Sequence, residues 1–512
     1  MSIFTRFARL FGGHSAARQV ATDEPRPIRA RYDAAQQGGM NEQHWAAADA
    51  LDADTAHSVA IRRRLSYRSR MEIGNNGYAK GTQRSISNFV VGRGPKLRML
   101  TGNPAFNRMI EARWQAWAKA VKLARKLRTA RKVQYADGES FLVARTNPAL
   151  GEFSVQLDIV GVECERVTTP YLGPGVEGRI DGIDFDAYDN PVTYHILRKS
   201  PGASMFGSLL GDKTDPVPAR FVCHLFGCDR WEHRAVPEST STLNLFAVSR
   251  RYREATVVAA ENIANISLVM KTQTTPSEGA DEVRPFSSVP FEKGTMVFSP
   301  MGYDVTQPRA EQPSATYPEF TRAQIAEQVR PAGMSYGLAA CDSSGASFSS
   351  AKLDHLSYFF GQVEVDQADI EEQACDPLFA LWFAEAVKIH GWNVPTSPAP
   401  AHDWDWPAKP EIDETKAAEA RGKKLSFGGA TLSRVYAEQG LDFEDEIAVM
   451  AADYGVTVEE LRARLLQVNL SGKAAAAPQT APPDDSDELD EPPPPPRRNA
   501  AAARNGNRRA PV

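Results

Sequence analysis

Apolar and polar positions alternate with a helical period from about residue 61 onward. Residues 61–88 form two such segments separated by Asn76-Gly77, and Phe89-Val90-Val91 then precedes the glycines and proline at 92–95. This pattern predicts a helix, an Asn-Gly break, a second helix and a short strand that leads into a turn.

A second apolar stripe follows within residues 105–119. Its large apolar side chains recur at three- and four-residue spacing, namely Phe106, Ile110, Trp114 and Trp117. Such spacing places the side chains on one face of a helix. We therefore expect a buried face that belongs to the core, and not a platform on which bases stack.

The period shortens between Lys132 and Phe226. Short runs rich in β-branched and aromatic residues alternate there with Gly, Pro and Asp-Asn turns. The runs are SFLVART (140–146), FSVQLDIV (153–160), GIDFDAYDNPVTYHIL (182–197) and FVCHLF (221–226). They predict an antiparallel sheet that packs on the preceding helices.

Long helical patterns dominate the next part of the chain. One helix is expected from the Ser/Thr cluster at 239–242 to about Lys271, a length of roughly 46 Å at 1.5 Å per residue. The region 272–315 predicts a small module with one strand, GTMVFSP (294–300). The remaining expectations are a helix at 317–328, a Gly/Ser-rich break at 333–350, and a helix at 349–374 that continues to His390.

The two ends of the chain are polar. Residues 1–60 predict a flexible arm with one helix near His44–Ala53. The segment DWDWPAKPEID (403–413) predicts a stiff linker on the surface with two anchored tryptophans, and 413–468 a compact set of helices. Beyond Gly472 the composition cannot bury enough apolar surface to fold, which predicts a disordered tail.

Composition and charge limit the class of protein. The chain has 512 residues, of which 42% are hydrophobic, and a net charge of −5. Residues 61–135 hold 19 Lys or Arg and 2 acids, so they carry +17 and the rest of the chain −22. Solvated basic helix faces are the simpler interpretation, and nucleic-acid contact is the alternative. Five scattered cysteines and no apolar run near 20 residues predict a reducing environment and no membrane span.

Four groups of residues were candidates for chemistry. Cys223, His224, Cys228 and His233 have metal-ligand chemistry, but neighbouring ligands on a strand point to opposite faces. The serines of 341–350 with His355 lack the fixed turn of a serine nucleophile. The glycines of 92–94 lack a P-loop lysine, and the acids of 403–405 lack a His or Cys partner. We therefore expect no catalytic, cofactor or metal site, and no ATPase, nuclease or hydrolase activity.

Several segments, in order along 61–460, resemble the lambda-type family of phage portal proteins. They are NNGYAKGTQRSISNFVVGRG (75–94), FNRMIEARWQAWA (106–118), ADGESFLVAR (136–145), HLFGCDRWEHRAVP (224–237), PSATYPEFTRAQIAEQV (313–329), GMSYGLAACDSSGASFSSAKLDH (333–355), WPAKPEIDETKAAEA (406–420) and GLDFEDEIAVMAADYG (440–455). The sequence departs from the family in one turn. His233 and Ala235 stand where Gln and Gly are usual, and Trp231 stands in place of Pro.

The resemblance implies an α+β portal fold with defined regions. These are a flexible arm (1–60), a wing (61–240, with part of 353–395), stem helices (241–271 and 316–332), a clip (272–315), a tunnel loop (333–352), a crown (396–470) and a disordered tail (471–512). It also implies a ring of twelve subunits at one capsid vertex, through which DNA enters and leaves. The residues expected to face DNA are Asp342, Ser343, Ser344, Ser347, Ser349, Ser350 and Lys352.

The partners implied by the resemblance are further copies of the chain, the terminase large subunit, head-completion or adaptor proteins, major capsid and scaffold proteins, and double-stranded DNA bound non-specifically. The location implied is the virion, with the host cytoplasm during assembly. Two rival hypotheses belong to other classes. A DNA-processing enzyme would need clustered acids for Mg²⁺ near the basic segment, which offers only Glu72 and Glu111. A monomeric virion adaptor would not need so long a helix interrupted by an insertion.

Overall fold

The computed structural model describes residues 43–151, 154–169, 178–201, 214–265, 269–272, 303–306, 314–407, 414–437, 439, 441 and 443–471. The chain divides into two compact units, Met1–Pro410 and Glu411–Val512. The expected tail at 472–512, the expected strand at 294–300 and the arm up to residue 42 lie outside the described residues.

The first unit begins with two consecutive helices. A one-turn helix, α3 (Ala53–Ala56), replaces the helix expected near His44–Ala53, since 45–47 form a turn. Helix α4 (Val59–Asn75) and helix α5 (Gly77–Val90) follow, as predicted. The break between them is at Asn76, whose side chain accepts a hydrogen bond from the Tyr78 amide at 3.1 Å and so begins α5.

The strand predicted at Phe89-Val90-Val91 is wrong. Phe89 and Val90 complete the last turn of α5 because Val90 is fully buried on its apolar face. The strand lies after the Gly-Pro turn, as β1 (Lys96–Met99).

Helices α6 (Pro104–Ala120) and α7 (Leu123–Asp137) build the main core. The predicted stripe of α6 is confirmed for Ile110, Trp114 and Trp117, which are buried, while Phe106 is half-buried. The Trp114 ring lies 5.4 Å from the Trp382 ring and 5.6 Å from the Phe379 ring, measured between centroids. These rings are packed edge to face in the core.

The predicted antiparallel strands form two sheets instead of one. The first has the order β3-β2-β8 and the second β4-β5-β6-β7, with all pairs antiparallel. The strands are β2 (Glu139–Thr146), β3 (Leu157–Val162), β4 (Arg179–Ile180), β5 (Ile183–Phe185), β6 (Pro191–Leu197), β7 (Thr214–Pro218) and β8 (Val222–Phe226).

Strand β2 separates two cores. Leu142 joins the main core, whereas Phe141 and Val143 point to the other face and join a second core with the four-stranded sheet. Because successive side chains alternate across a strand, a strand covered on both faces is apolar throughout. This explains the continuous run Phe141–Ala144.

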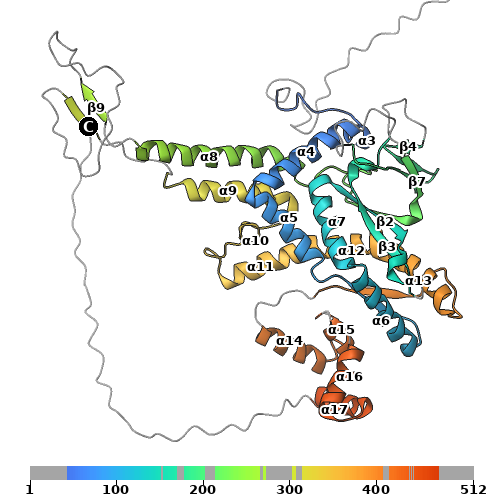
Figure 1. Cartoon of the computed structure of the whole chain (residues 1–512). Helices are drawn as coiled ribbons and strands as arrows, with labels where there is room; N and C mark the ends of the chain where they lie inside the picture. The colour runs from blue at the N-terminus through green and yellow to red at the C-terminus, as the bar shows by residue number, and fades with distance from the viewer. Residues whose placement is uncertain are drawn as a thin grey trace, which may run out of the picture. The chain divides into compact units, whose positions relative to one another are not determined.

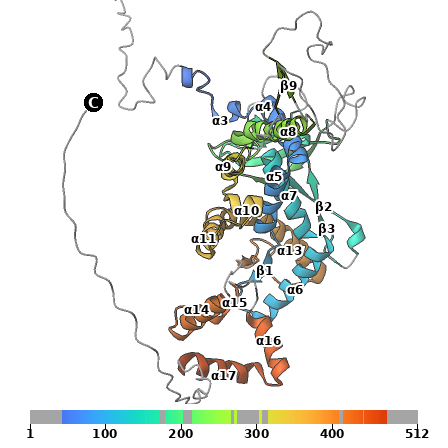
Figure 2. The same ribbon diagram turned by 90° about the vertical axis from the view of Figure 1, so that its left-hand side faces the viewer.

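Helix α8 is shorter than predicted. It spans Leu243–Asn265, 23 residues or about 34 Å, and Val269–Thr272 forms strand β9 instead of continuing the helix. Strand β9 pairs antiparallel with β10 (Tyr303–Thr306). Helix α9 (Tyr317–Val329) confirms the predicted helix and runs beside α8 in both views (Figure 1 and Figure 2).

A helical run of unusual length follows. It consists of α11 (Phe348–Tyr358), a π-helical stretch (Phe359–Val363), α12 (Glu364–Ile370), a second π-helical stretch (Glu371–Cys375) and α13 (Asp376–His390). The predicted continuation past Asp376-Pro377 is confirmed. None of the helices in the described ranges is long and apolar enough to span a membrane.

The expected surface linker at 403–413 begins as a strand. Strand β11 (His402–Asp405) pairs with β1, and Trp404 is buried in the main core. Most of the expected surface linker is therefore part of the first unit, which extends to Pro410. In the second unit, α14 (Glu414–Ser426), α15 (Leu432–Ala437), α16 (Phe443–Tyr454) and α17 (Val458–Ser471) confirm the predicted helical set.

Candidate functional site

The segment expected to be the tunnel loop is more ordered than a Gly/Ser loop. Residues 336–340 form a short helix, α10 (Tyr336–Ala340), and α11 already begins at Phe348. Met334 and Ala339 are buried in the main core. The predicted Gly/Ser-rich break at 333–350 is therefore partly helical and partly packed in the core, and only 341–347 connects helices.

Local hydrogen bonds shape the seven candidate residues. The Asp342 carboxylate accepts hydrogen bonds from the Ser344 amide (3.0 Å) and hydroxyl (2.6 Å), which lower the pKa of Asp342. Ser347 caps α11, since its hydroxyl oxygen accepts from the Ser350 amide at 3.2 Å. The exposed members of the set are Ser343, Ser344, Ser347, Ser349 and Ser350, while Asp342 and Lys352 are half-buried.

A second site is centred on the Asp-Gly-Glu motif at 137–139, which joins α7 to β2. Asp137 holds Arg70 of α4 by two hydrogen bonds of 2.7 and 2.9 Å. Gly138 has a φ of +90°, and a Cβ at this position would lie 2.4 Å from the Val236 backbone. Only glycine fits such a close approach with a left-handed backbone.

Glu139 is fully buried at the centre of a network of charges. Its carboxylate accepts hydrogen bonds from Arg62 (3.0 Å) and from two nitrogens of Arg234 (2.6 and 2.8 Å). The His224 ring nitrogen lies 3.2 Å from the same carboxylate. Asp181 forms ion pairs with both arginines and supplies the second negative charge.

Neighbouring charges decide the ionisation of this network. Burial alone would raise the pKa of Glu139, but the charges of Arg234 and Arg62 hold it well below its usual range. Burial lowers the pKa of His224, which favours its neutral form. Burial and the charge of Arg234 lower the pKa of Arg62 to about 10, so Arg62 stays protonated at neutral pH.

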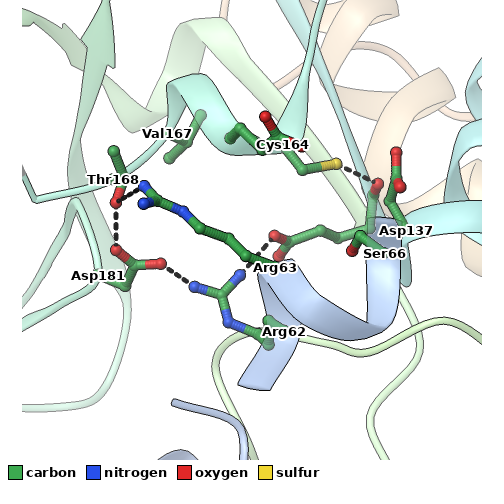
Figure 3. A pocket seen from close by; sticks show the side chains of 10 residues that line it. Arg62, Arg63, Ser66, Asp137, Cys164, Val167, Thr168 and Asp181 are labelled. Carbon is green, nitrogen blue, oxygen red and sulfur yellow. Dashed lines mark hydrogen bonds and ion pairs between the residues drawn. The ribbon is translucent and has the colours of Figure 1, made fainter. Parts of the chain in front are cut away.

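The network links five separate segments of the chain. Figure 3 shows Arg62 and Arg63 of α4 reaching Asp181 and Thr168, and the Thr168 hydroxyl lies 2.7 Å from Asp181 Oδ1. The cavity beside them measures only about 20 Å³, room for about one water molecule. The arrangement therefore holds α4, β2, β8, the turn at Asp181 and the 233–236 turn together and leaves no space for a substrate.

A second clamp joins α7 to the long helical run. Arg131 is buried and binds Glu238 at 2.6 and 3.2 Å and Asp366 of α12 at 2.8 and 3.1 Å. Two carboxylates thus neutralise one buried guanidinium, an arrangement that the planar donor fork of arginine suits.

The other sequence candidates are directed to separate partners. The Cys223 thiol is buried, which raises its pKa to about 12. The His233 ring nitrogen Nδ1 lies 2.9 Å from the Asp54 carboxylate, so His233 is engaged outside the expected cysteine and histidine group. In the part of the chain that the structure describes, no group of three or more His, Cys, Asp or Glu could hold a metal ion. The His355 ring lies beside the Phe89 ring, with 6.1 Å between the ring centroids.

The glycines at 92–94 and the acids at 403–405 have structural roles. A Cβ at Gly94 would lie 2.7 Å from the Ala124 Cβ, so the turn packs closely on α7. Asp403 pairs with Arg98 on the neighbouring strand.

Sequence reasoning found the Asp-Gly-Glu motif but missed its partners. Arg62, Asp181 and Arg234 lie far from Glu139 in the sequence and are indistinguishable there from charged surface residues. The sequence held one signal, because Arg234 lies in another of the segments that resemble the portal family, HLFGCDRWEHRAVP (224–237). The two motifs meet in space through the hydrogen bonds between Glu139 and Arg234.

The model of a protein family described as "Phage portal protein, lambda family" matches residues 39–359, well over half of the chain. The chain belongs to the lambda family of phage portal proteins. This family is structural and non-enzymatic, and membership places the chain among the proteins of the phage virion.

Two solved structures are similar at low identity. A chain in the neck of an empty gene transfer agent particle is 12% identical, with 73% of this chain and 92% of that chain covered and a TM-score of 0.44. An HK97-family phage portal protein from Corynebacterium diphtheriae is 11% identical, with 59% and 89% covered and a TM-score of 0.31. No curated protein sequence matches the chain.

Replacing Gly138 with alanine should destabilise the protein by more than about 2 kcal/mol, because the new Cβ would collide with the Val236 backbone and the backbone is left-handed. Gly391→Ala is the matched control, since its φ is also positive (+66°) but nothing lies within 4 Å. The control should lose only about 1 kcal/mol. Urea denaturation of both variants measures this, and equal losses would contradict the role of the Val236 contact.

Proposed function

We propose that the chain is one subunit of a closed ring of twelve copies at one capsid vertex, and that double-stranded DNA passes through its channel during packaging and ejection. Membership of the portal family is the observation that carries this proposal. A ring built from one chain uses heterologous contacts, in which different faces of neighbouring copies meet.

Within this ring the parts of the chain take different roles. The wing comprises 61–240 with part of 353–395, and the stem comprises α8 and α9. The clip corresponds to 272–315, and strand β9, which pairs with β10, extends it back to residue 269. The crown, expected at 396–470, corresponds to helices α14 to α17 of the second unit, because β11 pairs with β1 of the first unit.

The segment 333–352 is proposed to face the DNA channel. A channel must not retain DNA, and each Lys or Arg that neutralises a phosphate adds affinity through counterion release. The connection at 341–347 exposes Ser343, Ser344 and Ser347 and contains no Lys or Arg. Such a surface contacts phosphates weakly and lets the duplex slide.

The proposed partners follow from this role. They are further copies of the chain, the terminase large subunit during packaging, head-completion or adaptor proteins afterwards, major capsid and scaffold proteins, and double-stranded DNA without sequence preference. Assembly would take place in the host cytoplasm before the subunit becomes part of the virion.

The rival enzymatic function would need free acids for Mg²⁺ near the basic segment 61–135. The two acids of this segment are instead engaged in other contacts. The Glu72 carboxylate binds Arg250 at 2.9 Å, and Glu111 accepts a hydrogen bond from the Met99 amide at 2.6 Å. Both acids are therefore engaged in structural contacts.

Electron micrographs of the purified protein test the proposal. Class averages should show an annulus with a central channel wide enough for a DNA duplex, about 20 Å across. Compact particles without a channel would contradict it.

A further inference from the structure

A groove of about 630 Å³ lies between α7 and strands β2 and β3. Its floor is apolar and includes Val133, Leu142 and Val162. Its charged lining, which we call the rim, is mostly basic and consists of Arg70 of α4, Lys122 at the N-cap of α7, Arg125, Lys126 and Lys132 of α7, and the two acids Asp137 and Glu163. The groove therefore combines an apolar interior with a cationic edge.

Part of this positive charge has no counter-ion. Arg70 is neutralised by Asp137 and Glu165, and Lys126 by Asp158. Among the described residues, Lys122, Arg125 and Lys132 have no ion-pair partner. Burial lowers the pKa of Lys132, and the nearby charges of Arg84, Lys80 and Arg128 lower it further, so the excess positive charge extends from the groove to α5.

These features suit a protein segment better than DNA. The rim could contact a duplex, but a duplex about 20 Å wide cannot enter the groove to cover its apolar floor. Single-stranded DNA needs aromatic side chains on which bases stack, and the lining has none. A helix that exposes both apolar and acidic side chains would satisfy both floor and rim.

The first unit itself carries such a helix. From residue 353 to 387 the chain contains eight Asp or Glu and no Lys or Arg. Asp354, Glu364 and Glu372 are exposed on this run. Leu353 and Val365 are also exposed, by 64% and 53%, although both are large and apolar. We call this surface the acidic helix face.

The groove and the acidic helix face cannot meet within one copy. The groove is lined by a face of α7 centred on residues 125, 129, 133 and 136, flanked by 126, 130 and 132, whereas Arg131 points the other way and binds Asp366 of α12. Helix α7 therefore separates the groove from the long helical run. In Figure 2, α11 and the strands β2 and β3 lie on opposite sides of α5 and α7.

Opposite faces that are complementary in charge and in apolar surface are what a ring of identical subunits requires. A face that binds a different face of the next copy repeats around the ring until it closes. We infer that the groove between α7 and β2–β3 binds the acidic helix face of the neighbouring copy. This inference rests on the proposed ring and names one of its subunit contacts.

Charge reversal on each side tests the contact. One variant carries Lys122→Glu and Arg125→Glu, and the other Asp354→Lys and Glu364→Lys. All four side chains are exposed, so the subunits should still fold, which circular dichroism and thermal unfolding verify. The control is Lys423→Glu with Lys424→Glu on α14, which changes the net charge as much as the first variant.

Each reversed variant alone should lose its rings at concentrations at which the wild-type protein and the control are fully assembled. Co-expression of the two variants should restore rings, because the reversed groove of one copy fits the reversed helix face of the other. Restored rings should contain equal amounts of both variants and an even number of subunits by native mass spectrometry.

The outcomes distinguish failure of this subunit contact from failure of the proposed ring. Stable rings in either reversed variant alone, with wild-type rings intact, would overturn this contact and leave the proposed function standing. Loss of rings without recovery on co-expression would overturn the pairing as well. If the wild-type protein formed no rings, the proposed function would fail and this inference with it.

Discussion

Replacing Glu139 with glutamine is expected to lower the free energy of unfolding by about 3–5 kcal/mol. Glutamine has nearly the same shape, but it removes one of the two negative charges that neutralise Arg62 and Arg234. Buried charges without a counter-ion are among the most costly defects in a protein. Glu163→Gln is the matched control, because Glu163 is exposed just after the end of β3 and its replacement should cost no more than about 0.5 kcal/mol.

The same substitution predicts a pH dependence. The pKa of Glu139 is lowered in the folded protein, so its stabilising effect is complete above the unfolded value of about 4.3 and decreases as the pH falls below it. The difference between wild type and variant should therefore be constant near pH 7 and shrink by up to about 1.4 kcal/mol per pH unit in acid. Urea denaturation at several pH values measures it. A difference below about 1 kcal/mol at pH 7 would contradict a central role for Glu139.

Placing arginine at Ser343 and Ser349 should block DNA translocation while rings still form. Both side chains are exposed, and neither hydroxyl has a hydrogen-bond partner among the described residues, unlike Ser344, which bonds Asp342. In a ring of twelve, the variant adds about 24 cations around the duplex, and even partial phosphate neutralisation creates a salt-sensitive trap.

Two measurements follow this effect. The affinity of purified rings for duplex DNA should be higher than in the wild type. It should also decrease more steeply as salt is added, because the slope of log K against log salt becomes steeper by about 0.9 per phosphate neutralised. The yield of infectious particles should collapse. The control is glutamine at both positions, which adds length without charge and should package DNA normally. Normal particle yield from the arginine variant, with rings confirmed, would show that 341–350 does not face the DNA.

Most helices could be predicted from the sequence because their helical spacing of apolar residues continues over many residues. The stripe from Ile110 to Trp117 and the continuation past Pro377 could both be predicted, since proline is tolerated in the first turn of α13. Prediction failed at Val269–Thr272 and at Phe89-Val90, where short apolar runs suit either a helix or a strand. Tertiary packing decides such cases, and pairing with Tyr303–Thr306 made the first of them a strand.

The candidate sites could be predicted only in part. The small polar residues at 341–350 indicated an exposed segment, and residues 343–350 are exposed in the structure. The residues before them are packed in the core, because Met334 and Ala339 are buried. The charge network around Glu139 depends on contacts across 77 and 95 residues. No local pattern reveals such contacts, because a buried arginine looks the same in the sequence as an exposed one.

The ring is the central claim, and native mass spectrometry of the purified wild-type protein tests it most directly. The account predicts a closed assembly near twelve subunits, with eleven or thirteen as neighbouring species. A monomer of 56.1 kDa as the only species at every salt concentration would contradict it.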